Sequence, residues 1–399
     1  MTTANRSATP LASAVPLAAA GAPAPALLGR AWLPEAAGPA VVTVRGDTVF
    51  DVTATAAPTV RDVCEMDDPA AWLARASGRP LGRVDELLAN SVAATRDRAR
   101  PHLLAPIDLQ AIKASGVTFV VSLLERVIEE QAKGSPEKAA AIRSDIGRLI
   151  GHDLSKLVPG SPEAMRIKEA LIAKGVWSQY LEVGIGPDAE IFTKAQPLSA
   201  VGPGADIGIL PSSTWNNPEP EIAVVVDGSG RIKGATLGND VNLRDIEGRS
   251  ALLLGKAKDN NASCALGPFI RLFDGGFSLG DVKSAEIRLT VDGPEGYRLE
   301  GSSSMSRISR SPEALVAAAS GPHHQYPDGF VLFLGTMFAP IQDRDVAGQG
   351  FTHRVGDTVA IETAALGRLV NTVRHCDACE PWTFGASHLM RNLAARRLL

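Results

Sequence analysis

Five short runs rich in Val, Ile, Leu and Thr place the strongest constraint on the fold of this 399-residue chain. They read EIAVVVD, IKGATLGND, EIRLTVD, FVLFLGT and DTVAIET, and residues such as Gly, Pro and Asp separate them. Runs of this length and composition are typical of β-strands. Since no helical pattern alternates with them, we expect a β-dominated core over residues 180–369 and not a doubly wound parallel sheet.

The N-terminal part of the chain divides into a tail and a small unit. Residues 1–29 are rich in Ala and Pro, and prolines break their apolar stretch, which favours a flexible tail over a targeting segment. Residues 30–100 predict a small N-terminal α/β domain. It contains two short alternating runs that turn at Arg45-Gly46-Asp47, a hairpin signal, and helices in residues 67–76 and 83–95.

A catalytic domain is expected over residues 101–399, and it begins with a connection in residues 103–116. A helical insert follows in residues 122–175. Its segments start with Ser caps and carry Glu in the first turn, which is the pattern of a helix N-terminus. The overall fold class expected from this order is α+β.

The totals exclude several kinds of partner. The formal net charge is −4, so no basic excess indicates a nucleic-acid partner. No run of about 18 apolar residues lacks charge and proline, so no membrane span is expected. Four cysteines are too few for a disulfide scaffold, which favours a reducing compartment and predicts a cytoplasmic location.

Two glutamates at the start of a strand-like run are the first candidates for chemistry. Glu219 and Glu221 are two positions apart, so in a strand they project from the same face. If the next run pairs beside them, Asp240 approaches that face as well. Three carboxylates suit Mg²⁺, with Mn²⁺ or Ca²⁺ as alternatives, whereas no nearby His or Cys indicates zinc. A solvated acidic strand end is the other interpretation of the same spacing.

Several segments in order resemble the fumarylacetoacetate hydrolase superfamily. The metal site of that family resembles PEPEIAVVVDGSGRIKGATLGNDVNLRDIEG, and its lysine segment resembles KDNNASCALGPFI. Its strand leading into the core and its late Gly-Thr segment resemble IFTKAQP and GFVLFLGT. The resemblance covers about residues 116–336 and implies a mixed β-roll or β-sandwich catalytic domain, a smaller N-terminal domain and a helical lid region.

The resemblance implies a metal site made by Glu219, Glu221 and Asp240. Some members of the family use a fourth carboxylate, but this chain has Thr118 before Phe119 at the comparable place. The site therefore resembles the three-carboxylate, Mg²⁺ type. The family commonly forms homodimers or pairs of dimers, which sets the expectation for oligomeric state.

The resemblance also implies roles around the metal. Glu125 takes the place of a catalytic His as acid/base, although it is also the capping-box residue of its helix. Lys258 is expected to hold a substrate carboxylate or stabilise an enolate, with Lys256 nearby and a solvated lysine as the alternative. Arg244 is expected to bind substrate, or to pair with an acidic neighbour such as Asp245.

Three further places carry weaker signals. Thr336 is expected to bind the substrate carboxylate, or else to be an ordinary strand-end threonine. Cys376 and Cys379 form one Cys-x-x-Cys pair, which is too few ligands for a typical zinc site. His323 and His324 are expected in a loop, where a substrate contact remains open.

The reaction we expect from the resemblance is dehydration of a 2-keto-3-deoxypentonate, a 2-oxo acid, to 2,5-dioxopentanoate. The missing His, the missing fourth carboxylate and the segment AKDNNASCALGP favour the sugar-acid branch of the family. The runner-up is C–C hydrolysis of a 2,4-diketo-3-deoxy acid. A non-catalytic sugar-acid-binding protein is the alternative from another class.

Overall fold

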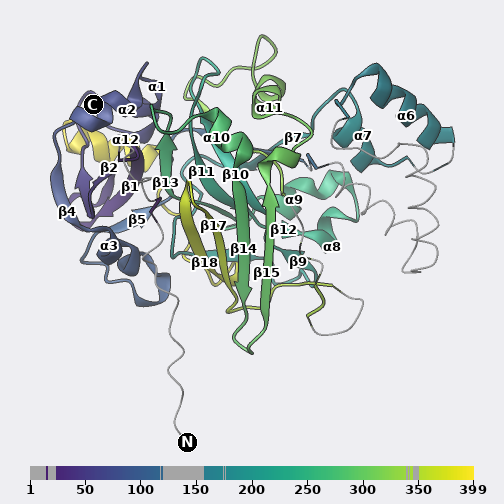
Figure 1. The fold of residues 1–399 in the computed structure, drawn as a ribbon. Coiled ribbons are helices and arrows are strands. Elements are labelled where there is room, and N and C mark those ends of the chain that lie inside the picture. Colours follow the sequence, from purple (N-terminus) through teal and green to yellow (C-terminus); the bar gives the residue numbers. More distant parts are fainter. Residues whose placement is uncertain are drawn as a thin grey trace, which may run out of the picture.

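The computed structural model describes residues 15–16, 24–116, 118–119, 157–173, 175, 177–337, 340, 342–344 and 350–399. Over these residues the chain has an α+β fold dominated by a mixed β-sheet. Figure 1 shows the N-terminal unit on one side of the core strands and helices α6 and α7 on the other.

In the described part of the chain, one 11-stranded sheet runs in the order β4-β3-β2-β1-β13-β11-β10-β16-β6-β7, with β5 paired to β1. Its strands are β1 (Leu27–Leu33), β2 (Gly38–Arg45), β3 (Thr48–Asp51), β4 (Arg79–Arg83), β5 (His102–Leu104), β6 (Ala111–Ser115), β7 (Ile191–Ala195), β10 (Pro220–Val226), β11 (Ile232–Asp240), β13 (Cys264–Leu272) and β16 (Phe330–Phe333). Neighbours are antiparallel except β16 and β6, which are parallel. The sheet continues from the N-terminal unit into the core, because β1 pairs with β13.

A second sheet, of five strands, runs in the order β15-β14-β17-β18-β8 within the described residues. Its strands are β8 (Asp206–Ile209), β14 (Glu286–Asp292), β15 (Arg298–Ser304), β17 (Thr358–Thr363) and β18 (Gly367–His375), and a separate short pair joins β9 (Asn216–Asn217) to β12 (Asn242–Leu243). Each of the five runs quoted from the sequence contributes a strand, namely β10, β11, β14, β16 and β17, although β16 ends at Phe333, before the last three residues of its run.

Strand β10 is buried on both faces, which explains its continuous run of β-branched residues. Ile222 and Val224 pack in the cluster that contains Leu289 of the five-stranded sheet. Ala223 and Val225, which point the other way, pack in a second cluster that includes residues of the N-terminal unit. The alternation fixes the register of β10, since a slip of one residue would exchange its two faces.

The helices are short and lie in the connections between the strands and after the last strand. They are α1 (Val60–Glu65), α2 (Pro69–Arg75), α3 (Val84–Ser91), α6 (Pro162–Ala173), α7 (Gln179–Ile185), α8 (Arg244–Glu247), α9 (Leu254–Lys258), α10 (Leu279–Ser284), α11 (Pro312–Ala319) and α12 (Ala386–Ala395). The expected helices in residues 67–76, 83–95 and 161–175 are confirmed as α2, α3 and α6. The helices expected in residues 122–134 and 135–150 lie outside the described residues.

The hairpin expected at Gly46 is confirmed, because β2 and β3 pair up to Arg45 and Thr48 and Gly46 takes a left-handed φ of 62°. The expected connection in residues 103–116 is wrong in part. Ala111–Ser115 forms β6, which lies between β16 and β7 in the large sheet. The run AIKAS does not predict a strand from the sequence, because it is short and Lys113 separates its buried positions, such as Ile112.

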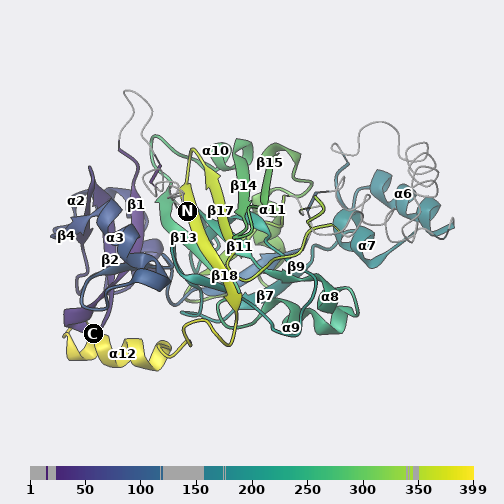
Figure 2. The ribbon, with the colours of Figure 1, turned by 90° about the horizontal axis from the view of Figure 1, so that it is seen from below.

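The C-terminal helix α12 returns to the N-terminal unit (Figure 2). The Asn392 amide donates to the backbone oxygens of Ala36 and Ala37, and the Arg396 guanidinium donates to Pro39. These bonds, together with the shared sheet, attach residues 30–100 to the core. The division of the chain into domains stays a prediction.

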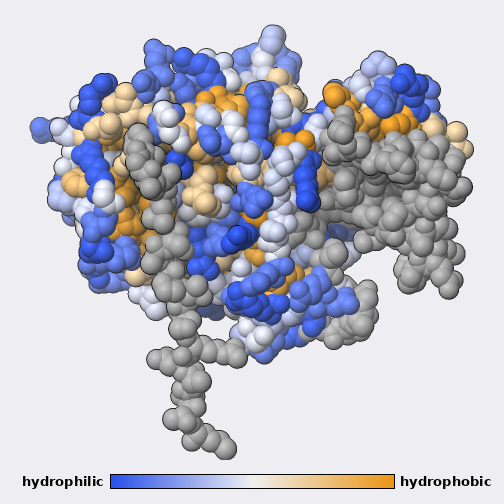
Figure 3. Space-filling model, in the orientation of Figure 1, coloured by the Kyte–Doolittle hydropathy of each residue, from blue (hydrophilic) through white to orange (hydrophobic). Residues whose placement is uncertain are grey.

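The surface seen in Figure 3 mixes hydrophilic residues with smaller groups of hydrophobic ones, for example around α10. Among the described residues, no helix has both the length and the apolar character needed to cross a membrane.

Candidate metal and substrate site

The register of β10 and β11 brings three carboxylates to one face. Pro220 pairs with Asn239 and Glu221 with Gly238, so Glu219 and Asp240 lie opposite each other at the strand ends. The Asp240 amide donates to the Glu219 carbonyl at 3.1 Å, which continues this pairing. Residues opposite each other in an antiparallel pair share a face, as do positions i and i+2. The structure thus confirms the geometry expected for the three acids.

The three carboxylates are buried and close together. Glu219, Glu221 and Asp240 are 5%, 1% and 1% exposed, which excludes the solvated strand end. Each residue offers one carboxylate oxygen, and these three oxygens lie within 4.8 Å of one another. Buried carboxylates are unfavourable unless cations or hydrogen-bond donors surround them.

Two buried lysines face this cluster. The Lys258 ammonium lies 2.6 Å from Glu219 Oε2 and 3.2 Å from Asp240 Oδ2, and the residue is 3% exposed, so it is not a solvated lysine. The Lys194 ammonium lies 2.8 Å from Asp240 Oδ1 and is fully buried on β7. When all five groups are ionised, one negative charge remains without compensation inside the protein.

The pKa shifts follow from this charge balance. Burial raises the pKa of Glu221 well above its ordinary value, and the charges of Asp240 and Glu219 add to the shift. Burial alone would raise the pKa of Asp240, but Lys194 and Lys258 hold it below its usual range. Burial alone would lower the pKa of Lys258, but Asp240 and Glu219 raise it.

A divalent cation fits this donor set. Glu221 accepts from the Gly335 amide through Oε2 at 2.7 Å, while its Oε1 is buried and has no hydrogen-bond partner in the described part of the structure. An unpartnered buried carboxylate oxygen beside two others is the hard oxygen environment that Mg²⁺ and Ca²⁺ prefer. Thr118 donates to the Leu334 carbonyl at 2.8 Å, so the place expected for a fourth carboxylate holds a hydroxyl.

Outer contacts hold Glu219 in place. The Asn242 amide donates to Glu219 Oε1 at 3.1 Å and to Glu247 Oε2 at 2.5 Å. The backbone N–H of Glu219 donates to the side-chain oxygen of Asn239 at 3.1 Å. Such bonds fix the orientation of a carboxylate before a ligand arrives.

A small cavity adjoins the cluster and brings in further polar side chains. Glu219, Lys258 and Thr336 line it together with Glu190. Thr336 is 4% exposed and lies three residues after the end of β16, and its contact with substrate stays a prediction. Burial raises the pKa of Glu190, and the charges of Glu247, Glu219 and Asp240 add to this shift. A carboxyl group whose pKa is raised in this way is suited to accept and return a proton.

The remaining expected site residues fall elsewhere. Glu125 lies outside the described residues. Arg244 is the first residue of α8, and its guanidinium lies over the Trp215 ring at 5.3 Å. His323 and His324 are exposed in the loop after α11. A role for Arg244 or for these histidines stays a prediction.

The Cys-x-x-Cys pair forms no disulfide in the structure. Cys376 and Cys379 are both free thiols, and Cys379 is buried in the turn after β18.

Sequence reasoning assigned no role to two residues of this site. Lys194 stands in the segment IFTKAQP, and a lysine in a strand that enters the core is a usable signal, because lysine is rarely buried without a partner. Glu190 immediately precedes that strand, and its sequence context carries no comparable signal.

Comparisons with known proteins give one family match and two sequence relatives. Residues 181–374 match the family described as fumarylacetoacetate (FAA) hydrolase, C-terminal. A "probable 2-keto-3-deoxyxylonate dehydratase" of Haloferax volcanii is 32% identical over 194 residues, which cover 49% of this chain and 63% of the relative. A "2-dehydro-3-deoxy-D-arabinonate dehydratase" of Saccharolobus solfataricus is 32% identical over 185 residues, 46% of this chain and 58% of the relative. The chain thus matches less than two thirds of the length of each.

Solved structures share the fold. A 2-keto-3-deoxy-D-arabinonate dehydratase complexed with magnesium and 2,5-dioxopentanoate superposes with a TM-score of 0.61 and 22% identity, covering 88% of this chain and 99% of that one. A 5-carboxymethyl-2-hydroxymuconate delta-isomerase from Mycobacterium smegmatis gives a TM-score of 0.51 and 20% identity, covering 88% and 98%. At these identities the likeness concerns the fold alone.

Proposed function

Because this chain carries a fumarylacetoacetate hydrolase C-terminal domain over residues 181–374, we propose that it is a Mg²⁺-dependent dehydratase of a 2-keto-3-deoxy sugar acid. The substrate we favour is 2-keto-3-deoxypentonate and the product 2,5-dioxopentanoate. The observation that carries the proposal is the buried cluster of Glu219, Glu221 and Asp240 beside two lysines. The names of the two relatives quoted above support the substrate class.

The three carboxylates would hold the Mg²⁺ ion. When bound, the ion supplies a Lewis acid for the oxygens of a 2-oxo acid and makes its C3 protons more acidic. Mn²⁺ and Ca²⁺ also suit the oxygen donors, so the identity of the metal is part of the proposal.

The chain's own residues divide the remaining work. Thr336 would bind the substrate carboxylate, and the Lys258 ammonium would stabilise negative charge that develops on the substrate. Glu190, whose pKa is raised by burial, would accept a C3 proton and return a proton to the departing C4 hydroxyl, which leaves as water. A proton shift from C5 to C3 then gives the C4=C5 enol, and transfer of the C5 hydroxyl proton to C4 gives the aldehyde. Glu125 keeps the acid/base role expected from the sequence as the alternative to Glu190.

Several properties of the whole protein belong to the same proposal. We expect a cytoplasmic enzyme that forms a homodimer or a dimer of dimers. A helical lid would cover the site from residues 122–175, over a β-roll core, and Arg244 would contact the substrate. Size-exclusion chromatography with light scattering tests the oligomeric state.

Proton NMR in D₂O tests the proposed function. With Mg²⁺ and 2-keto-3-deoxypentonate, the C3 signals should exchange and the aldehyde signal of 2,5-dioxopentanoate should appear. A non-catalytic binding protein would cause neither change, and a hydrolase would release pyruvate from a 2,4-diketo-3-deoxy acid instead.

Paired variants decide between the two acid/base candidates. Glu190→Gln should lower kcat by about 10²- to 10⁴-fold, as is usual for loss of a general acid/base, while the exposed Glu286→Gln should not change it. If Glu125→Gln gives the large loss and Glu190→Gln does not, the role passes to Glu125.

A further inference from the structure

A second and larger cavity, of about 440 Å³, lies between the N-terminal unit, the core and the segment that precedes α12. Its volume falls within the usual range of roughly 300–1,000 Å³ for small-molecule sites. Among the described residues, none of those lining it belongs to the carboxylate cluster or to the cavity beside that cluster. It is therefore a separate space, which the proposed reaction does not use.

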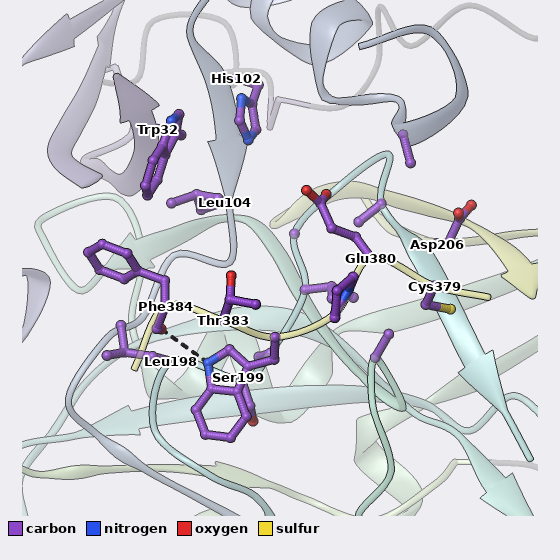
Figure 4. A pocket seen from close by; sticks show the side chains of 18 of the residues that line it. Trp32, His102, Leu104, Leu198, Ser199, Asp206, Cys379, Glu380, Thr383 and Phe384 are labelled. Carbon is purple, nitrogen blue, oxygen red and sulfur yellow. Dashed lines mark hydrogen bonds between the residues drawn. The ribbon is translucent and has the colours of Figure 1, made fainter. Parts of the chain in front are cut away.

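One wall of this cavity is formed by alternate side chains of strands β1 and β5. Arg30 pairs with Leu104 and Trp32 with His102 across β1 and β5, so these four side chains share one face. The intervening residues Ala31 and Leu103 pack in the core of the N-terminal unit, and Leu103 also borders the cavity. All four residues line the cavity, and Figure 4 shows Trp32, His102 and Leu104 at one side of it.

The apolar part of the wall is aromatic. The Trp32 and Phe384 rings meet edge to face, with centroids 5.3 Å apart. Trp382 also lines the cavity and is 46% exposed, and its indole N–H donates to the Phe384 carbonyl at 3.1 Å. Leu198 and Phe384 lie side by side in Figure 4. Rings placed in this way offer flat surfaces to a planar ligand.

The polar part of the wall contains buried nitrogens that lack partners. Arg30 and His102 are 6% and 8% exposed. Arg30 Nε and His102 Nδ1 have no hydrogen-bond partner within the described ranges, and Arg96 Nε is in the same situation. A buried donor without an acceptor is unfavourable, so an acceptor-rich ligand would be stabilised here.

The charge of the lining favours an anion. Three arginines, Arg30, Arg96 and Arg98, line the cavity with two acids, Asp206 and Glu380. Arg96 and Arg98 both contact Glu380, at 2.9 Å and 3.2 Å. The lining residues thus carry one positive charge in excess. Buried Asp108 lies near Arg30 and Arg374 lies 3.7 Å from Asp206, and counting this further acid and further arginine leaves the excess unchanged. Guanidinium groups bind carboxylates through paired N–H donors.

The geometry points to a second binding site, for a small planar carboxylate whose ring lies against Trp32 and Phe384. Its carboxylate would accept hydrogen bonds from the Nε groups of Arg30 and Arg96, with the His102 ring beside it. The ligand class is thus an aromatic or heteroaromatic monocarboxylic acid.

The cavity is linked to the carboxylate cluster through one short turn. Asn261 and Ala262 line the cavity, three and four residues after Lys258. The Ser263 hydroxyl donates to the Lys258 carbonyl at 2.8 Å, and the Asn261 amide donates to Cys376 at 3.0 Å. An occupied cavity therefore touches the turn that carries Lys258.

Fluorine NMR with 6-fluoro-2-naphthoate tests the site, with the uncharged 6-fluoro-2-naphthamide as the matched probe. We expect saturable broadening of the naphthoate signal at submillimolar concentration and at least about 10-fold weaker binding of the amide, because the amide lacks the charge. Ser199→Trp, which fills the cavity, should abolish binding, while Ser306→Trp at an exposed position should not. Arg96→Met should weaken binding by about 10-fold, because it removes one of the guanidinium groups that donate to the carboxylate.

Three results would overturn the site. These are no saturable binding to the intact protein, equal affinity for the acid and the amide, or unchanged binding in a folded Ser199→Trp variant. Chelation of Mg²⁺ with EDTA and the Glu221→Gln variant separate this test from the proposed function, because both should leave naphthoate binding intact. Loss of binding in either would place the probe in the carboxylate cluster and refute the second site.

Discussion

Replacing Glu221 by Gln should stabilise the metal-free protein. The three acids lie within 4.8 Å of one another, and two unit charges at that distance repel by about 3.5 kcal/mol at an effective dielectric constant of roughly 20. Glutamine keeps the acceptor for the Gly335 amide and offers an N–H₂ group to the other two carboxylates. With an unfolding entropy of about 2.1 cal/mol/K per residue, a gain of that size corresponds to a rise in Tm of about 4 °C for this chain.

Mg²⁺, in contrast, should stabilise the wild-type protein and not the variant. An ion that binds only the folded protein stabilises it by about 2.7 kcal/mol at 100 times its Kd, so the wild-type Tm should rise by about 3 °C. Glu221→Gln removes one of three ligands and should lose this rise. The variant is therefore more stable without metal and insensitive to it.

Differential scanning calorimetry with and without Mg²⁺ measures both effects, with Glu286→Gln as the exposed control. Because the folded pKa of Glu221 is raised, its favourable contribution is present below its unfolded pKa and is lost as the pH rises through the folded value. The gap between variant and wild type should thus vanish in acid and widen as pH rises. A metal-free variant that melts several degrees below wild type, or that keeps the Mg²⁺ response, would refute the reasoning.

Three further predictions concern buried charges. Lys194→Met should destabilise the metal-free protein by about 3–5 kcal/mol and enlarge the Mg²⁺-induced rise in Tm, because an acid loses its cation; an unchanged rise would contradict this. Asp357→Asn should lower the free energy of unfolding by about 3–5 kcal/mol in urea titrations, because the Arg344 guanidinium donates one hydrogen bond to each oxygen of that carboxylate. Burial and Arg96 lower the pKa of His102 to about 4, so stability should fall as pH drops from 6.5 toward 4 and this slope should flatten in His102→Gln.

The sequence predicted the structure best where a strand-like run and the run that pairs with it both had a clear strand composition. The runs of β-branched residues predicted strands β10 and β11, and the two-residue spacing of Glu219 and Glu221 placed them on one face, which Asp240 joins from the paired strand. The Gly46 turn was equally readable, because a two-residue hairpin needs a positive φ there.

Other features depend on contacts between residues far apart in sequence. β6 is short, and it is a strand because β16 and β7 lie on either side of it. Glu190 acquires its raised pKa from burial and from acids on other elements, which no local pattern encodes. Lys194 was visible as a lysine in an apolar segment, but its partner Asp240 is 46 residues away in the sequence.

A coupled assay tests the central claim most directly. Purified protein, Mg²⁺ and 2-keto-3-deoxypentonate are mixed with a semialdehyde dehydrogenase, and reduction of NAD(P)⁺ is followed. The account predicts turnover that disappears on chelation of Mg²⁺ and in Glu221→Gln, and that persists in Glu286→Gln. Turnover that survives both losses, or pyruvate released from a 2,4-diketo-3-deoxy acid in place of any semialdehyde, would contradict it.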